Sequence, residues 1–555
     1  MTLAGVTPFP AEFAARYRQL GYWEDRPLGD VFRECFASHG DRTAVVDGDE
    51  RWTFAELGSG SERLAMNLRD LGIGPLTPVV MHLPNVIDFI LLYFALERLG
   101  AIPLMALPGH REHEIGHYVE FVEAAAYAIP PRYGAFDCLD LGRRMMAPGR
   151  PLRQVLVAGD APHEPGFVGI RELLARTPHS TARDLDRLAI NPDDPCVFQL
   201  SGGTTGVPKI IPRSHNDYVY NSRLIAAVND IRVDDSLLVA APIGHNFPLA
   251  SPGLQGFFLH GAAVVLSPTA RAADVLWRIE QERVTHLEIV PAMVLAWLND
   301  DLIGTHDLSS VRVINSGGQK FQPETKRRTE AAFPKALVQE VFGMAEGLLM
   351  ITRLDDSERV RYETAGRPIC PDDEVKLVDD DGLEVAPGAI GELLCRGPYT
   401  LRGYYRAPEA NRRAFTADGF YCSGDLLRQH PSGNYVVEGR KKDLVNRGGE
   451  KISAEEVEDM LLTHPAVANV ACVPMPDPVL GERMCAFVQP RGPKAPTLNQ
   501  LTALLSELGL ARFKHPERLE VVARLPLSPF GKVQKSVLAK RAAELAETPS
   551  EGDQE

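Results

Sequence analysis

Five short apolar runs in the middle of the chain constrain its fold more than any other feature. Each run ends in Gly or Pro and is separated from the next by helix-forming sequence. The runs are SLLVAAPI (236–243), AAVVLSP (262–268), THLEIVP (285–291), VRVINSGG (311–318) and LVQEVFG (337–343). Apolar strands that alternate with helices are typical of a parallel sheet, and open α/β sheets bind ligands at the carboxyl ends of their strands. The sequence therefore predicts an α/β fold with binding loops along one sheet edge.

The region upstream of this series follows the same pattern. Stretches of helical period alternate with short β-like runs, which indicates further parallel βαβ units. The predicted helices are 28–39, 54–71 and 87–99, and the predicted strands are 43–47 and 78–83. The most apolar window, 86–107, is interrupted by charged residues and a proline, so it is predicted to be a core helix and strand and not a membrane span.

After Gly366 the pattern changes to short strands with tight turns, which predicts a small antiparallel, β-barrel-like unit. A charged hinge, GRKKD (439–443), leads from this unit into a region with its own helix and strand pattern. A chain of 555 residues exceeds what one hydrophobic core supports. We therefore predict a large N-terminal domain at 1–439, a smaller α+β C-terminal domain at 440–545 and a disordered tail at 546–555.

The composition excludes several classes of protein. A formal net charge of −15 argues against a surface that binds nucleic acid or anionic membranes. Residues 1–16 lack the basic stretch and apolar core of a signal peptide. The eight cysteines form no CxxC pairs and have no histidines close by in the sequence, which disfavours a zinc site and a disulfide framework. We expect a cytoplasmic enzyme without nucleic-acid or membrane partners, and leave open whether it forms a homodimer.

Residues 198–215, FQLSGGTTGVPKIIPRSH, contain the clearest candidate binding loop. Glycines can take positive φ and bring backbone amides close to an anion, while hydroxyls add donors and a lysine adds charge. The candidate phosphate-binding residues are Ser201, Gly202, Gly203, Thr204, Thr205, Gly206 and Lys209. The loop is not a P-loop, because Lys209 follows Pro208 and precedes no Ser or Thr. A flexible Gly/Ser turn is the alternative interpretation.

Four further motifs join this loop. They are FGMAEG (342–347), YCSGDLL (421–427), EGRKKDLVNRGGEKI (438–452) and LSPFGKVQK (527–535). In order and spacing the five motifs resemble the adenylate-forming superfamily, which includes acyl-CoA synthetases, firefly-type luciferases and the adenylation domains of nonribosomal peptide assembly lines. The resemblance covers nearly the whole chain. It implies an acyl-CoA synthetase/luciferase-like fold with a mobile C-terminal domain.

A narrower resemblance appears in FPAEFAARYRQLGYWEDRPL (9–28) and GHNFPLASPG (244–253). Both segments are similar to stand-alone aryl-acid AMP ligases of siderophore and related pathways, which activate salicylate or 2,3-dihydroxybenzoate. The resemblance implies that ATP converts the acid to an aryl-adenylate with release of pyrophosphate, and that a thiol then takes the acyl group. The thiol belongs to a phosphopantetheine on a carrier protein acting in trans or, as the close alternative, to free coenzyme A.

Site residues follow from the same resemblance. It implies that Lys532 bridges the carboxylate and the α-phosphate, that Glu346 holds Mg²⁺ and that the C-terminal domain rotates about a hinge at Lys442. Asp425 is expected to accept hydrogen bonds from the ribose hydroxyls, since a carboxylate offers several lone pairs to adjacent donors. Besides the glycine-rich loop and Asp425, the expected nucleotide contacts are Gly317, Gly318, Val341, Phe342, Gly343 and Arg440.

The resemblance also outlines an acyl pocket with conflicting indications of its substrate. Its expected residues are His245, placed beside the entrance and counted as catalytic, Asn246, which contacts the carboxylate and ortho-hydroxyl, and Phe247, Ser251, Gly317 and Leu349 around the ring. Ser251 suits a second ring hydroxyl, whereas Leu349 resembles the salicylate version. This chain departs from the subgroup at Glu288, Asn315, Gln319 and Met350. Polar changes beside the pocket keep a heteroaromatic or amino-substituted acid, such as 3-hydroxypicolinate, as an alternative substrate.

Two other functions remain as alternatives. A nucleotide-binding regulator without catalysis would not need Lys532, Asp425 and Glu346, all of which are present. A luciferase-like oxygenase would share the fold and the first half-reaction, and oxygen uptake would reveal it.

Overall fold

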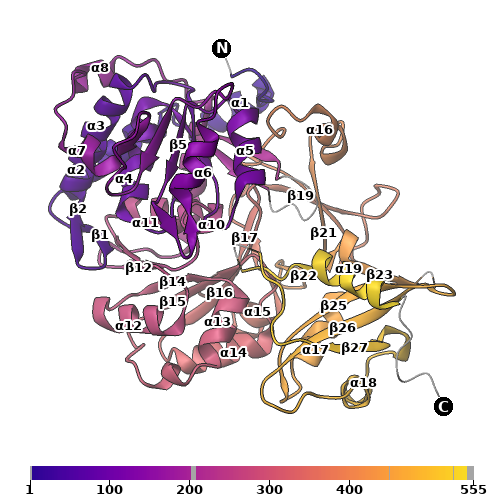
Figure 1. Cartoon of the computed structure of the whole chain (residues 1–555). Helices are drawn as coiled ribbons and strands as arrows, with labels where there is room; N and C mark the ends of the chain where they lie inside the picture. Colours follow the sequence, from indigo (N-terminus) through magenta and orange to yellow (C-terminus); the bar gives the residue numbers. More distant parts are fainter. Residues whose placement is uncertain (1–2, 202–207, 449, 529–530, 547–555) are drawn as a thin grey trace.

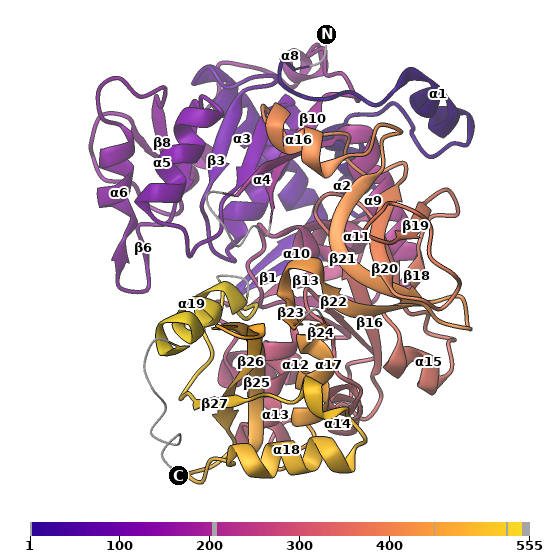
Figure 2. The same cartoon turned by 90° about the vertical axis from the view of Figure 1, so that its right-hand side faces the viewer.

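The computed structural model describes residues 3–201, 208–448, 450–528 and 531–546. Two large sheets form the N-terminal part, and a four-stranded antiparallel sheet connects them to a separate C-terminal sheet (Figures 1 and 2). Within the described residues, no helix is both long enough and apolar enough to cross a membrane. All eight cysteines are free.

The nine-stranded sheet has the order β18-β17-β16-β15-β14-β12-β13-β1-β2. Its strands are β1 (Thr43–Asp47), β2 (Glu50–Thr53), β12 (Ser236–Val239), β13 (Ala263–Leu266), β14 (His286–Ile289), β15 (Val313–Gly317), β16 (Leu337–Gly343), β17 (Leu349–Ile351) and β18 (Arg367–Pro368). The five predicted runs form β12 to β16 and pair in parallel, which confirms the central prediction. Several strands are shorter than the predicted runs. The run 236–243, for example, forms a strand only as far as Val239, which pairs with Leu266, the last residue of β13.

The seven-stranded sheet has the order β11-β10-β4-β3-β5-β8-β9. Its strands are β3 (Pro78–Met81), β4 (Ile102–Met105), β5 (Ala126–Ile129), β8 (Gln154–Val157), β9 (Phe167–Gly169), β10 (Pro195–Leu200) and β11 (Ile210–Ser214). The first two predicted strands fall in different sheets, because β1 pairs with β13 whereas β3 pairs with β4 and β5. Between the two sheets, α4 (Ile87–Leu99) is buried along its whole length in a core that contains residues of both.

Helices cover both large sheets (Figure 1). Those of the first half are α1 (Ala11–Gln19), α2 (Leu28–His39), α3 (Phe54–Asp70), α5 (Glu112–Phe121), α6 (Cys138–Met145), α7 (Ile170–Ala175) and α8 (Ala182–Asp186). Those that follow are α9 (His215–Val228), α10 (Asn246–Ala250), α11 (Gly253–Leu259), α12 (Ala272–Glu282), α13 (Pro291–Leu298), α14 (Pro323–Ala332), α15 (Glu358–Glu363) and α16 (Pro408–Ala414). The helices predicted at 28–39 and 87–99 match α2 and α4.

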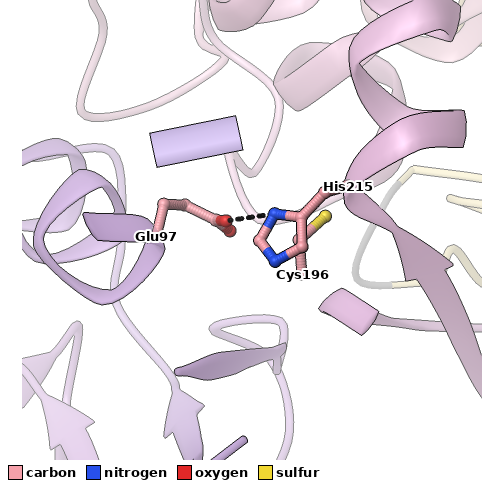
Figure 3. Close-up of side chains that lie close together, drawn as sticks. All are labelled: Glu97, Cys196 and His215. Carbon is pink, nitrogen blue, oxygen red and sulfur yellow. Dashed lines mark ion pairs between the residues drawn. The ribbon is translucent and has the colours of Figure 1, made fainter. Parts of the chain in front are cut away.

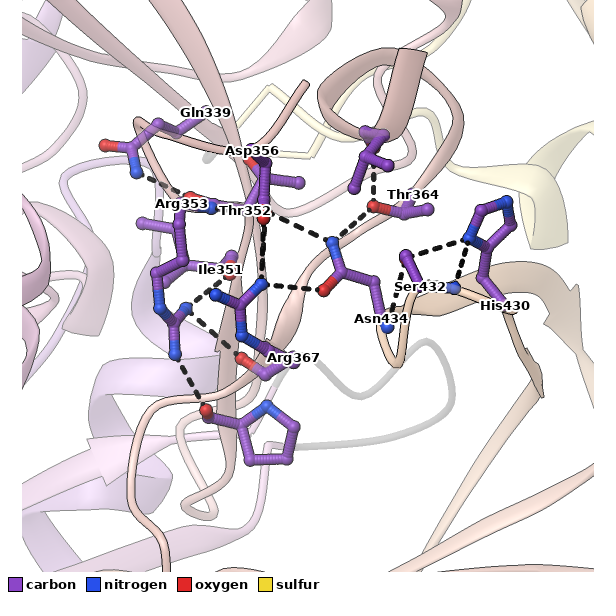
Figure 4. Close-up of polar contacts among 12 residues, drawn as sticks. Gln339, Ile351, Thr352, Arg353, Asp356, Thr364, Arg367, His430, Ser432 and Asn434 are labelled. Carbon is purple, nitrogen blue, oxygen red and sulfur yellow. Dashed lines mark hydrogen bonds and ion pairs between the residues drawn. The ribbon is translucent and has the colours of Figure 1, made fainter. Parts of the chain in front are cut away.

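The antiparallel unit predicted after Gly366 is a four-stranded sheet of order β19-β20-β21-β22. Its strands are β19 (Glu374–Val378), β20 (Gly391–Arg396), β21 (Tyr421–Gln429) and β22 (Tyr435–Arg440). The turn between β21 and β22 is joined to the nine-stranded sheet by a polar network in which Asn434 accepts a hydrogen bond from Arg367 over 3.0 Å (Figure 4). The turn end of this hairpin is therefore attached to the nine-stranded sheet.

The C-terminal region forms its own sheet with cores on both faces. Its elements are β23 (Leu444–Arg447), β24 (Glu450–Ser453), α17 (Ala454–Leu461), β25 (Val467–Asp477), β26 (Gly481–Pro490), α18 (Leu498–Glu507), β27 (Arg518–Val521) and α19 (Lys535–Ala546). An ion pair of 2.9 Å between Lys320 and Asp459 joins it to the N-terminal part. Ala546, the first residue of the predicted tail, ends α19, and the rest of that tail lies outside the described residues.

Candidate active site

The glycine-rich loop joins two antiparallel strands, β10 and β11. Its ends are held together because the Ser201 amide donates to the Lys209 carbonyl over 2.9 Å and the Lys209 amide donates to Ser201 Oγ over 3.0 Å. A P-loop would instead connect a strand to a helix. The other predicted phosphate-binding residues, Gly202, Gly203, Thr204, Thr205 and Gly206, lie outside the described residues.

A tyrosine connects Lys209 to Glu346. The Lys209 ammonium lies 4.6 Å from the centre of the Tyr404 ring, and the Tyr404 hydroxyl donates to Glu346 Oε1 over 2.8 Å. Burial, together with the charge of Glu346, raises the pKa of Tyr404, so its hydroxyl keeps the proton that it donates. Sequence reasoning missed Tyr404; its only signal is its place in RGPYTLRGYY (396–405), a segment that resembles the subgroup.

Glu346 occupies the tight turn between β16 and β17. The turn needs glycine at position 347, where φ is +152° and a Cβ would lie 2.4 Å from Thr400 Cα. The Glu346 carbonyl accepts a hydrogen bond from the Leu401 amide over 2.8 Å, which fixes the backbone, and the residue is only 8% exposed. A buried carboxylate held in a fixed position fits a hard cation shared with phosphate oxygens, the coordination that Mg²⁺ prefers.

Asp425 and Arg440 are cross-strand neighbours on β21 and β22. Arg440 Nε donates to Asp425 Oδ1 over 2.8 Å. Burial raises the pKa of Asp425, while the charges of Arg440 and Lys532 oppose that rise. A hollow of about 370 Å³ beside the pair is lined by Ser423, Gly424, Arg440 and Lys441. The two predicted nucleotide contacts thus form an ion pair in which Asp425 is buried and Arg440 lines the hollow.

Lys532 lies at the end of a tight turn in the C-terminal region. The Ser528 amide donates to the Lys532 carbonyl over 2.7 Å, and the Lys532 amide donates to Ser528 Oγ over 3.0 Å. Between them, Gly531 has φ +85° and sits so close to the N-terminal part that a Cβ there would lie 3.1 Å from Val290. Val290 directly follows β14, so the turn is seated at the carboxyl edge of the parallel sheet.

This seating brings Lys532 close to two other predicted site residues. Burial, and then the charge of Lys532, lower the pKa of His245 well below its usual value, so the imidazole is neutral. The same lysine acts on the pKa of Asp425. Lys532, His245 and Asp425 come from three distant parts of the sequence and converge at one place.

Asn246 begins the short helix α10 at the predicted acyl pocket. Its side-chain carbonyl accepts from the Tyr218 hydroxyl over 2.9 Å, and its amide donates to Ser251 Oγ over 3.2 Å. Gln199 in turn donates to the Tyr218 hydroxyl over 3.2 Å. His245 caps the helix, since its Nδ1 accepts from the Phe247 amide over 3.1 Å. Tyr218 was missed from sequence because one tyrosine on a helix gives no signal of a site.

Phe247 lies against the sheet at Gly317, where a Cβ would come within 3.4 Å of its ring. Gly317 pairs with Val341 across the sheet, and Gly343 pairs with Leu349. Phe247, Val341 and Leu349 belong to one buried cluster, which agrees with a shared pocket wall. The other two expected nucleotide contacts belong to the same two strands. Phe342 lies inside β16, and Gly318 directly follows β15.

Met350, a departure that sequence reasoning connected with substrate choice, faces the other way. It is fully buried among Leu348, Leu393 and Tyr404, in the cluster on the opposite side of β17 from Leu349. Successive residues of a strand point to opposite faces, so Leu349 and Met350 cannot both face the pocket. Met350 therefore acts on the packing of the antiparallel sheet and not on the acyl pocket.

The predicted hinge residue Lys442 lies in η2 (Lys441–Asp443), a short 3₁₀ turn directly after β22. The neighbouring Lys441 forms ion pairs with Glu392 at 2.9 Å and Asp380 at 3.2 Å. The segment is thus held to the antiparallel sheet before the chain enters β23.

A separate buried cluster brings together Glu97, Cys196 and His215 (Figure 3). Its donor set suggests a metal site, but His215 Nδ1, the ring nitrogen nearest Glu97, accepts a hydrogen bond from the Leu28 amide over 3.0 Å. Burial raises the pKa of Glu97 and of Cys196 and lowers that of His215 to about 3, so all three are neutral. These residues pack α4, β10, α9 and α2 together in the core, and we assign them a structural role.

Comparison with known proteins decides the family. Residues 32–405 match the model of the AMP-binding enzyme family, and residues 456–532 match the AMP-binding enzyme C-terminal domain. The chain belongs to this family. Lys532 is the last residue of the second match in this AMP-binding enzyme.

The AMP-binding enzyme is similar to its relatives over nearly its whole length. A 2,3-dihydroxybenzoate-AMP ligase of Bacillus subtilis (strain 168) is 44% identical, with 98% of each chain covered. A salicylyl-CoA synthase / salicylate adenylyltransferase of a Streptomyces species is 46% identical, with 97% of this chain and 98% of the relative covered. The apo structure of Mycobacterium smegmatis MbtA has a TM-score of 0.74 at 40% identity, with 97% of this chain and 99% of that chain covered. The predicted adenylate-forming fold and the resemblance to aryl-acid AMP ligases are confirmed.

Proposed function

We propose that the enzyme activates an ortho-hydroxylated aryl acid, of the salicylate or 2,3-dihydroxybenzoate type, with ATP and passes the acyl group to a thiol. The observation that carries the proposal is the convergence of Lys532 with His245 and Asp425 at the carboxyl edge of the parallel sheet. The names of the relatives, which include both acids, support the substrate class.

In the first half-reaction a carboxylate oxygen attacks the α-phosphorus of ATP. The bond from that phosphorus to the bridging oxygen of the β-phosphate breaks, and pyrophosphate leaves. Lys532 lies where its charge stabilises the negative charge shared by carboxylate and α-phosphate, and the neutral His245 beside it adds no opposing positive charge. Asp425 holds the ribose hydroxyls, and Lys209 binds the leaving phosphates.

Mg²⁺ bound with the phosphates would neutralise their charge at Glu346. The contribution of the protein is the fixed position of that carboxylate, which the Tyr404 hydroxyl and the Leu401 amide maintain.

In the second half-reaction a thiolate sulfur attacks the acyl carbonyl carbon, the bond to the AMP oxygen breaks and AMP leaves. We propose the phosphopantetheine thiol of a separate carrier protein as the acceptor. Free coenzyme A is the second candidate, because one of the relatives is named a salicylyl-CoA synthase.

Substrate-dependent exchange of labelled pyrophosphate into ATP tests the proposal. Salicylate, 2,3-dihydroxybenzoate and 3-hydroxypicolinate are compared with benzoate and aliphatic acids, and each acceptor thiol is then supplied to the loaded enzyme. We expect exchange with at least one ortho-hydroxylated acid. Failure of all three combined with exchange on aliphatic acids would refute it.

A further inference from the structure

Three polar side chains form a row across the parallel sheet beside the acyl pocket. Glu288 on β14 pairs with Asn315 on β15, which pairs with Gln339 on β16. Their exposed fractions are 2%, 1% and 0%. Side chains of this polarity are rarely placed in the buried centre of a parallel sheet unless they are paired.

The row faces the same side of the sheet as the pocket. Leu287, Ile314 and Val338, one residue away on each strand, belong to the core on the opposite face, beneath α12 and α13. Gly317, which contacts Phe247, and its partner Val341 lie two residues further along β15 and β16, on the face of the row. The row thus lies roughly 7 Å deeper than this contact, measured from the carboxyl edge.

Each member of the row uses one polar atom within the protein. Glu288 Oε1 accepts from the Gly253 amide over 2.7 Å, the Asn315 amide donates to Asn229 Oδ1 over 2.6 Å, and the Gln339 amide donates to the Thr352 carbonyl over 2.5 Å. The remaining polar atom of each side chain is an oxygen, Oε2 of Glu288, Oδ1 of Asn315 and Oε1 of Gln339, and it is buried without a hydrogen-bond partner among the described residues. All three unpartnered atoms are acceptors, so the matching chemistry is a hydrogen-bond donor.

Glu288 is also joined to the pocket through the chain itself. Its partner Gly253 lies two residues after Ser251, an expected pocket residue, and takes φ +52° in a turn so tight that a Cβ would lie 2.5 Å from the Pro248 backbone. The carboxyl group is therefore hydrogen-bonded to the segment that carries the expected pocket residue Ser251.

We propose that Glu288 is a specificity-determining residue that selects acids whose ring carries a hydrogen-bond donor on the side away from the carboxylate. The donor is an amino, hydroxyl or ring N–H group, and Glu288 Oε2 accepts its hydrogen bond. The inference rests on the proposed function, since it concerns the acid bound in that same pocket. A buried acceptor left unpaired discriminates strongly against a ligand that lacks the donor.

The pKa of Glu288 is coupled to such a donor. Burial raises the pKa of Glu288 to about 8, with the Gly253 amide opposing the rise. Oε2 is an acceptor in the ionised form, so a ring donor bonded to Oε2 stabilises that form and lowers the pKa of Glu288.

Pyrophosphate exchange with paired salicylates tests the inference. The pairs are 4-aminosalicylate with 4-methylsalicylate, and 5-aminosalicylate with 5-methylsalicylate, because a methyl group has about the size of an amino group but no donor. We expect the wild-type enzyme to prefer the amino member of at least one pair by about tenfold or more in kcat/KM. Glu288→Ala, and Glu288→Leu with a side chain of similar volume, should abolish or reverse that preference.

The ratio of kcat/KM for the two members of a pair distinguishes a loss of selectivity from a loss of folded enzyme, because a misfolded pocket lowers both values together. Glu97→Gln is the matched control, since it changes a fully buried carboxyl group outside the pocket, and should keep the wild-type ratio. Equal wild-type rates within both pairs, or a preference that survives in both Glu288 variants, would overturn the inference and leave the proposed function standing. If no aryl acid supports exchange, both fail.

Discussion

At the scale of single residues, Tyr404 is the contact that joins the two phosphate-site motifs. Its ring lies beside Lys209 and its hydroxyl donates to Glu346 and lies 3.1 Å from the Tyr421 hydroxyl. We predict that Tyr404→Phe raises the KM for ATP about tenfold, because Glu346 loses a buried hydrogen bond worth roughly 1–2 kcal/mol while the ring contact with Lys209 remains.

Steady-state kinetics with varied ATP at saturating Mg²⁺ measures this effect. Tyr421→Phe is the control, since within the described residues the Tyr421 hydroxyl lies beside that of Tyr404 and makes no hydrogen bond to Glu346. An equal effect of the two substitutions would contradict the special role of Tyr404.

We predict that Lys532 acts in the adenylation step and not in thiol transfer. We predict that Lys532→Ala lowers the rate of adenylation by roughly two to three orders of magnitude, because one such charge contact is worth at most about 4 kcal/mol. Thiol transfer from preformed adenylate should remain largely intact. Separate assays of the two half-reactions measure this, and equal losses in both would refute the assignment.

The buried carboxyl of Glu288 predicts a pH-dependent stability. Its pKa of about 8 in the folded protein exceeds the usual value of 4.5 for a glutamate, so above pH 4.5 only the unfolded chain ionises and the folded state loses stability until pH 8. Glu288→Gln does not titrate. The free energy of unfolding of the variant, measured relative to wild type, should therefore increase by about 3 kcal/mol between pH 5 and pH 7.5. Urea unfolding at both pH values measures the difference, and a constant difference would refute the shift.

Glu346, Asp425 and Lys532 were indicated by the resemblance of their motifs to the adenylate-forming superfamily. The same reasoning missed Tyr218 and Tyr404, since a tyrosine on a helix or in a loop is as common in cores as in sites. It also could not separate Leu349 from Met350, because the face of a strand is decided by its register with neighbouring strands.

At the scale of elements, the hairpin of β21 and β22 positions Asp425 and Arg440. Its turn is anchored by Asn434, which is fully buried, accepts from Arg367 and donates to Thr364 Oγ1 over 2.9 Å (Figure 4). We predict that Asn434→Ala lowers the free energy of unfolding by about 2–3 kcal/mol, because it leaves buried partners unsatisfied. It should also raise the KM for ATP several-fold.

Urea unfolding and ATP kinetics together test this role. Ser432→Ala in the same turn is the control, since Ser432 is exposed and its hydroxyl bonds only within the turn. Loss of stability with an unchanged KM would show that the network holds the fold but does not position the nucleotide contacts.

The helices and strands themselves followed largely from sequence. The helix at 87–99 was predicted as core because it lies in the most apolar window of the sequence, and α4 is indeed buried throughout. The sheet to which each strand belongs did not follow, since β1 reaches across more than two hundred residues to pair with β13. Pairing of this kind depends on how layers pack and leaves no local pattern.

At the scale of the whole molecule, the two half-reactions place different demands on the C-terminal region. Its present orientation seats Lys532 at the site and is held by contacts such as Lys320 with Asp459. We predict that Lys442→Pro, which fixes φ in the 3₁₀ turn after β22, slows thioester formation much more than adenylate formation.

Rapid-quench measurement of each step tests this prediction. Lys442→Ala, which leaves the backbone free, is the control and should affect both steps little. Parallel losses in the two steps of the proline variant would argue against a hinge at this residue.

By itself, the sequence determined the α/β class, the strands of the parallel sheet and the motifs of an adenylate-forming enzyme, because these depend on residue period and on short glycine-rich segments. The tertiary structure alone decided which side chains share a site. Lys532 meets His245 and Asp425, and Glu288 aligns with Asn315 and Gln339, only through strand register and domain packing. These long-range contacts depend on how the whole chain buries its apolar surface, and no local segment encodes them.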